Sequence, residues 1–159
     1  MYLPSEIKTI NNVYGERIVP KGKKYSKHHR GWDLGNDLNT EIVASAGGKV
    51  LFKGWLDDFC GWSITIDHGS GWKTHYYHLN KFATIGDYVG QGQVIGYMGS
   101  IGASSTGVHL HFAISHGFTA DGRYNYLDPA NYITLPKGLT MAWDVRYNST
   151  TGRYENITK

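Results

Sequence analysis

The chain has 159 residues, enough for one domain with a single buried core. Its composition, with 40% hydrophobic and 18% charged residues, is that of a folded, weakly charged protein. Its 21 glycines are about twice the average usage, and no stretch between them exceeds 15 residues, which excludes long helices and coiled coils. No apolar run is near the ~20 residues that a membrane span needs. The net charge of +3 suits an anionic partner such as a cell wall or nucleic acid, but it also describes many ordinary enzymes. We therefore expect one all-β domain over residues 1–159, with few or short helices.

Short alternating runs separated by glycine turns fill the middle of the chain. Residues 49–52 follow a Gly-Gly pair, and residues 63–67 alternate with period two. After a glycine-containing turn, residues 72–79 are predicted to form the returning strand of a hairpin. Six glycines between positions 86 and 102 then separate one or two further short strands. This pattern is typical of a compact, turn-rich β domain.

The clearest predicted strand covers residues 108–115. Successive side chains point to opposite faces of a strand, so one face carries four apolar residues and is expected to join the core. These are Val108, Leu110, Phe112 and Ile114. His109 and His111 lie on the other face, where two imidazoles two residues apart are held side by side.

The tail, residues 133–159, also alternates. Apolar residues recur at every second position from 139 to 147, and a turn at 149–152 predicts a final β hairpin ending near Ile157. We expect this hairpin to cover an edge of the sheet; a surface for assembly or wall binding is the alternative.

Four histidines occur in settings that suggest chemistry. His29 and Asp33 face the same way in an extended segment, with Gly31 leaving room between them, and both are good Zn²⁺ ligands. Together with the His109–His111 pair and His78, they fit a catalytic zinc site with three protein ligands and a fourth position for water. The helical His-Glu-x-x-His motif is absent from the sequence, so any base must be histidine. The other histidines are expected to be structural: His28, His68, His75 and His116.

Three motifs in this order resemble the lysostaphin/LytM family of zinc peptidases. They are His-Arg-Gly-Trp-Asp at 29–33, Tyr-Tyr-His-Leu at 76–79 and a closing run at 99–112 that contains His109-Leu110-His111. A glycine-rich run at 86–96 is similar to the family as well. The resemblance covers residues 15–132 and implies a twisted antiparallel sheet with a narrow groove walled by loops.

By this resemblance His29, Asp33 and His111 would bind Zn²⁺, and His78 and His109 would be the catalytic pair. In the implied reaction, a zinc-activated water loses a proton to an imidazole and attacks a peptide carbonyl, while the second histidine stabilises the oxyanion. The implied substrate is the cross-bridge or stem peptide of bacterial peptidoglycan. Two aromatic residues, Tyr25 and Trp32, are candidate groove residues; Trp32 stands where relatives usually carry an aliphatic residue.

Two other functions compete with this interpretation. A non-catalytic relative that binds the wall or activates another hydrolase would typically lack a metal ligand, whereas all five expected residues are present. A nucleic-acid-binding β barrel leaves the paired histidines unexplained, so we expect no nucleic-acid partner.

The N-terminal segment lacks the charged and apolar regions of a signal peptide. We therefore expect a wall-degrading domain of a larger phage or bacterial protein, acting outside the cell, at the cell wall or on a virion.

Overall fold

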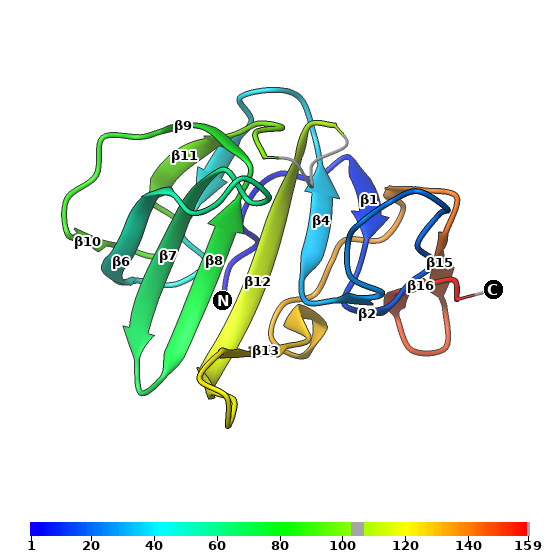
Figure 1. The fold of residues 1–159 in the computed structure, drawn as a ribbon. Coiled ribbons are helices and arrows are strands. Elements are labelled where there is room, and N and C mark those ends of the chain that lie inside the picture. The colour runs from blue at the N-terminus through cyan, green and yellow to red at the C-terminus, as the bar shows by residue number, and fades with distance from the viewer. Residues whose placement is uncertain (103–106, 159) are drawn as a thin grey trace.

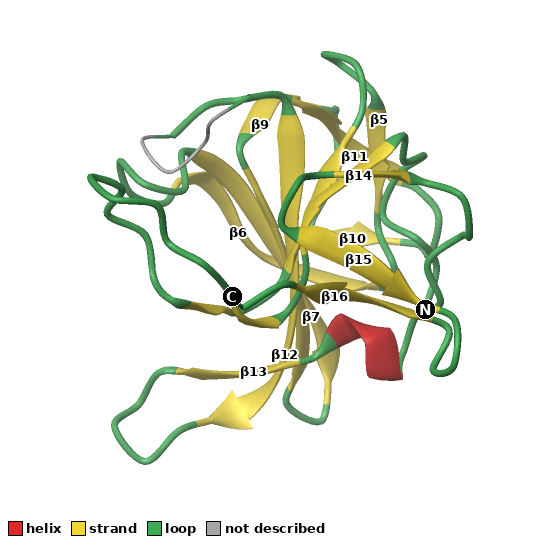
Figure 2. Cartoon of the chain, turned by 90° about the vertical axis from the view of Figure 1, so that its right-hand side faces the viewer, coloured by secondary structure: helices red, strands yellow, loops and turns green. Residues whose placement is uncertain are grey.

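The computed structural model describes residues 1–102 and 107–158, so residues 103–106 of the closing motif and Lys159 lie outside the described part. The described residues form a β structure (Figure 1) whose one helical element is a single short turn, η1 (Pro129–Asn131). Figure 2 shows this turn beside strands and loops only. The all-β fold expected from the sequence is confirmed. No helix of the described residues is long and apolar enough to cross a membrane.

Strands account for the regular structure of the chain. In chain order they are β1 (Thr9–Asn12), β2 (Gly15–Glu16), β3 (His28–His29), β4 (Trp32–Gly35), β5 (Glu41–Val43), β6 (Gly48–Trp55), β7 (Trp62–Gly69), β8 (Trp72–Tyr77), β9 (Leu79–Phe82), β10 (Tyr88–Val89), β11 (Val94–Met98), β12 (His109–Phe118), β13 (Tyr124–Leu127), β14 (Thr140–Met141), β15 (Val145–Asn148) and β16 (Arg153–Asn156).

The main sheet has nine strands in the order β10-β6-β7-β8-β12-β4-β1-β14, with β13 also paired to β12. Its pairs are antiparallel except for β1 and β14. The long strand β12 lies between β8 and β4 (Figure 1). In this register His111 lies opposite Tyr77 on one side and opposite Asp33 on the other. The sheet therefore brings together two motifs that lie 78 residues apart in sequence.

The core lies between this sheet and a smaller one, of order β5-β11-β9. One continuous apolar cluster takes residues from both sheets, which ties the strands together by hydrophobic burial. Its largest fully buried side chains are Trp32, Tyr76, Phe112, Ile10, Leu34, Ile42, Ile64, Ile66, Leu79, Ile95, Met98 and Leu110.

Trp32 belongs to this core, so its prediction as a groove residue is wrong. Its side chain is 1% exposed and its ring lies 6.2 Å from that of Phe112. The reason is the alternation of β4: Asp33 points to one face of the sheet, so Trp32 and Leu34 on either side of it must point to the other.

The predicted strand over residues 72–79 is also wrong in one respect. Strand β8 ends at Tyr77 and β9 begins at Leu79, because His78 has a left-handed backbone with φ of +67°. A residue with a side chain seldom adopts this conformation, and such positions cluster at functional sites. Hydrophobic alternation carries no signal for it.

His75 is a structural histidine, buried at the centre of β8 with no exposed surface. Its Nδ1 lies 3.1 Å from Thr65 Oγ1 and its Nε2 lies 2.8 Å from Ser115 Oγ. Burial lowers the pKa of His75 to about 3, and the neighbouring His111 and Lys73 act in the same direction. The folded protein therefore keeps this imidazole neutral where the unfolded chain protonates it.

This difference predicts a loss of stability in acid. Between pH 6.5 and about 3 the unfolded state binds the extra proton, so the free energy of unfolding falls as pH falls, by up to about 1.4 kcal/mol per pH unit. In a His75→Gln variant this dependence should be shallower, as measured by urea unfolding between pH 6.5 and 4. Parallel pH profiles of the two proteins would contradict the prediction.

The C-terminal segment packs against the N-terminal strand β1 and the residues that follow it. Strand β14 runs parallel to β1, and β15 and β16 form a hairpin at that end of the sheet (Figure 1). Val145 and Tyr154 enter the core, at 5% and 7% exposure. The Asn156 side chain accepts from the N–H of Val13 at 2.9 Å and donates to its carbonyl. The segment is thus a packed part of the domain.

Candidate metal centre and active site

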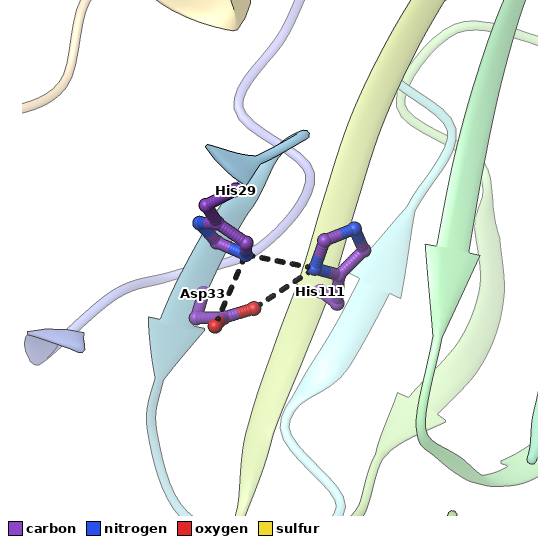
Figure 3. Close-up of side chains that lie close together, drawn as sticks. All are labelled: His29, Asp33 and His111. Atoms are coloured by element: carbon purple, nitrogen blue, oxygen red, sulfur yellow. Dashed lines mark hydrogen bonds and ion pairs between the residues drawn. The ribbon is translucent and has the colours of Figure 1, made fainter. Parts of the chain in front are cut away.

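Three side chains converge at the junction of β3, β4 and β12 (Figure 3). His29 Nε2 lies 3.2 Å from Asp33 Oδ2 and 3.2 Å from His111 Nδ1, and His111 Nδ1 lies 2.9 Å from Asp33 Oδ1. The sequence predicted these three residues as ligands, and the fold brings their candidate ligand atoms within 4.8 Å of one another.

The short break between β3 and β4 makes this approach possible. His29 ends β3 and Asp33 lies in β4, with Arg30 and Gly31 between the two strands. A Cβ atom at Gly31 would collide with the backbone oxygen of Phe112 and press on the His111 ring. Glycine is therefore required here for close packing against β12.

Neighbouring groups fix the orientation of both imidazoles. His29 is 3% exposed, and its Nδ1–H donates to the carbonyl of Val13 at 2.9 Å, which leaves Nε2 to face Asp33 and His111. The Tyr77 ring stacks on His111, with centroids 5.1 Å apart and planes 9° apart. Such outer contacts are typical of metal-ligating histidines, because they fix the tautomer and the ring direction.

The electrostatics of the cluster favour an ionised Asp33 carboxylate and a neutral His111 imidazole. Burial alone would raise the pKa of Asp33, but His29, His109 and the hydrogen bond from His111 hold it well below its usual range. Burial lowers the pKa of His111, against the opposing effect of Asp33. Deprotonated ligands of this kind are the form that binds a metal ion.

The donor set fits a zinc ion. Zinc bonds to imidazole nitrogen and carboxylate oxygen at about 2.0–2.2 Å, so ligand atoms around a tetrahedral ion lie roughly 3.4 Å apart. The three separations of 2.9–3.2 Å are slightly shorter than this. Three protein ligands with a fourth position open to a pocket are the pattern of a catalytic rather than a structural zinc site.

His78 and His109 lie beside this cluster with matching hydrogen bonds. His78 Nδ1–H donates to the carbonyl of Ile101 at 2.9 Å, and His109 Nδ1–H donates to that of Gly107 at 3.0 Å. Their ring centroids are 4.9 Å apart, and His109 Nε2 lies 3.6 Å from Asp33 Oδ1. In both rings Nε2 is thus the nitrogen that can exchange protons with a substrate. Burial lowers the pKa of His78 to about 4, with His109 adding to the effect, so His78 is a neutral base at physiological pH.

A pocket of about 390 Å³ is lined by all five predicted site residues, the three candidate ligands together with His78 and His109. Tyr25, a candidate groove residue, lines it as well. Several lining residues were missed by sequence reasoning. Most come from the two ends of the chain and carry no motif: Asn11, Asn12, Arg17, Pro20, Ala142, Trp143 and Asp144. The other two, Cys60 and Tyr77, come from the middle of the chain, and Tyr77 precedes His78 in its motif.

Cys60 is the one thiol of the chain, and its environment makes it a poor nucleophile. Burial and the nearby Asp57 raise the pKa of the Cys60 thiol to about 12, so the reactive thiolate is scarce at neutral pH. A Cys60→Ser variant should therefore retain the hydrolytic rate of the parent protein. A variant that melts normally but has lost its activity would contradict a metal-dependent reaction.

Comparison with known proteins matches residues 27–129 to the model of Peptidase family M23. The DD-carboxypeptidase/endopeptidase Mpg of Neisseria meningitidis is 37% identical over 103 residues, which are 65% of this chain and 23% of Mpg. The chain thus corresponds to about a quarter of the length of that relative.

Solved structures agree with the sequence match. The catalytic domain of the antimicrobial peptidase lysostaphin from Staphylococcus simulans superposes with a TM-score of 0.63 at 31% identity, covering 76% of this chain and 87% of that domain. A zinc-containing peptidase from Vibrio cholerae gives a TM-score of 0.62 at 26% identity, covering 80% of this chain and 37% of that protein.

Proposed function

The chain belongs to peptidase family M23, and on that premise we propose that it is a zinc endopeptidase that hydrolyses the cross-bridge or stem peptides of bacterial peptidoglycan. The observation that carries the proposal is the meeting of two imidazoles and a carboxylate in a pocket that two further imidazoles also line. The names of similar proteins, a DD-carboxypeptidase/endopeptidase and an antimicrobial peptidase, support the substrate class.

The cofactor is zinc, and in this proposal His29, Asp33 and His111 hold it. When bound, the ion supplies Lewis acidity, which acidifies water and polarises a peptide carbonyl. His29 and His111 offer neutral nitrogens and Asp33 the negative charge. The site then retains a net charge near +1, which preserves that acidity.

His78 and His109 carry the proton transfers. One imidazole takes a proton from the attacking water at Nε2 and passes it to the nitrogen of the leaving amine. The other donates a hydrogen bond from Nε2–H to the oxyanion that develops on the carbonyl, and because its Nδ1–H is also in use, this ring takes part protonated on both nitrogens. The backbone carbonyls of Ile101 and Gly107 hold the Nδ1–H of each ring, so both rings are oriented before substrate arrives.

The proposed place of action is the peptidoglycan layer, outside the cell or on a virion, as a wall-degrading domain of a phage or bacterial protein. Its partner there is the wall peptide itself.

Digestion of purified peptidoglycan tests the function directly. Walls with two different cross-link chemistries are incubated with the protein, with and without a zinc chelator, and the released peptides are identified by mass spectrometry. Chelator-sensitive release with new amine termini is expected, and the fragments name the bond. Failure to release peptides from either wall by a protein that also lacks zinc would favour the alternative, a non-catalytic module that binds the wall or activates another hydrolase.

A further inference from the structure

The C-terminal segment lines one side of the active-site pocket, and this segment lies outside the residues matched to the family. Ala142, Trp143 and Asp144 line the same pocket as the five histidine and aspartate residues of the site, while the family match ends at residue 129. This segment lies outside the residues matched to the family and borders the site, so it is placed to distinguish substrates.

Backbone hydrogen bonds fix residues 142–145, which form the turn at this side of the pocket. The N–H of Ala142 donates to the carbonyl of Ile10 at 2.9 Å, and the N–H of Val145 donates back to Ala142 at 3.1 Å. The N–H of Ile157, from the far end of the hairpin, donates to the Asp144 carbonyl at 2.7 Å. Asp144 is thus fixed at the edge of the pocket by its backbone.

Asn12 lies on the neighbouring strand and borders the metal centre. It pairs with Asp33 across β1 and β4 and lines the pocket, yet its side chain is only 6% exposed. Among the described residues, its Oδ1 has no hydrogen-bond partner. A buried acceptor without a donor costs free energy, which a donor from a ligand would recover.

Asn12 and Asp144 line the same pocket, and hydrogen bonds link the two segments that carry them. Asn156 bonds both backbone groups of Val13, next to Asn12, and Ile157, next to Asn156, bonds Asp144. Within the described part of the chain, no hydrogen bond or ion pair engages the Asp144 carboxylate. Arg17 also lines the pocket and attracts the Asp144 carboxylate at longer range. Its own Nε–H donates to the carbonyl of Ser26, and its guanidinium lies over the Tyr25 ring.

We propose that Asn12 and Asp144 form a subsite that binds an ammonium group of the peptide substrate beside the scissile bond. Both offer acceptor oxygens, and Asp144 adds the negative charge that selects a cation over a neutral amide. Trp143, 71% exposed at the same turn, offers an apolar face to the alkyl stem of such a group. The inference rests on the proposed peptidase function, since the ammonium belongs to its substrate.

The test compares one substrate in two forms. Peptide dimers isolated from both wall types are used with their free amines intact or acetylated, which removes the charge. The parent protein should show a kcat/KM at least about tenfold higher for the free amine. Asp144→Asn should bring this ratio close to unity, and Asn12→Ala should lower the ratio as well. Asp87→Asn, which removes an exposed carboxylate away from the pocket, should leave the ratio unchanged.

A parent ratio near unity, or a ratio that survives Asp144→Asn, would overturn the subsite; a ratio that survives Asn12→Ala would remove Asn12 from it. A binding measurement separates the subsite from the peptidase function. The equilibrium affinities of the free and acetylated dimers are measured for the zinc-loaded His109→Ala protein, and again after Asp144→Asn is added to it. Cleavage of both dimers without preference would retain the peptidase and reject the subsite. Preference in binding that depends on Asp144, without cleavage by the parent protein, would retain the subsite and reject the peptidase.

Discussion

Replacing His111 by alanine is expected to empty the metal site and abolish peptide hydrolysis. His111 Nδ1 makes the shortest of the three contacts in the cluster, 2.9 Å to Asp33 Oδ1. Its removal leaves two protein ligands where a catalytic zinc site needs three. It also removes a hydrogen bond that keeps the pKa of Asp33 low. Zinc per chain, measured by mass spectrometry after dialysis, should fall to background together with the release of wall peptides.

The matched control is His116→Ala, five positions along the same strand. His116 is exposed, stacks on Trp72 and donates to the carbonyl of Ser70. It is not among the residues that line the pocket. This variant should keep both zinc and activity. A His111→Ala protein that retained zinc at the parent level would show that the ion is held elsewhere.

Replacing His109 by alanine is expected to separate metal binding from catalysis. His109 lies beside the cluster, with Nε2 3.6 Å from Asp33 Oδ1, but it is not among the three residues whose ligand atoms meet. The variant should keep its zinc while the hydrolytic rate falls by about 10² to 10⁴, the usual cost of losing a general acid–base group. Zinc content and the rate of peptide release, measured on one preparation, test both parts.

The result for zinc decides the division of roles in the His-x-His strand. If His109→Ala also lost the metal, then His109 would be a ligand, and the division of roles within this strand, with His111 as ligand and His109 as acid–base group, would be wrong. A melting curve for each variant separates loss of metal from loss of fold.

Strand alternation predicted the centre of this site well. The pattern of residues 108–115 placed His109 and His111 on one face, and β12 carries them there. The same alternation, applied to β4, would have assigned Trp32 to the core, because it follows from the position of Asp33. Its prediction as a groove residue rests on the family resemblance and on its place between the paired ligands, and burial at 1% exposure overrules it.

Other parts of the site could not be predicted from local sequence. The left-handed backbone of His78 depends on the contact of its ring and its N–H with the loops at Ile101 and Cys60. Asn12 and Asp144 lie 132 positions apart and line one pocket because the C-terminal segment bonds to the N-terminal one, through the pairing of β14 with β1 and the bonds of Asn156 to Val13. Contacts of this kind are set by the tertiary fold, for which periodicity gives no signal.

Reconstitution of the metal-free protein tests the central claim most directly. The protein is stripped with a chelator, zinc is added back in steps, and bound zinc and released wall peptides are measured on the same samples. The account predicts that release rises with bound zinc and saturates at one ion per chain. Release by the metal-free protein, or no release from either wall at full zinc loading, would contradict it.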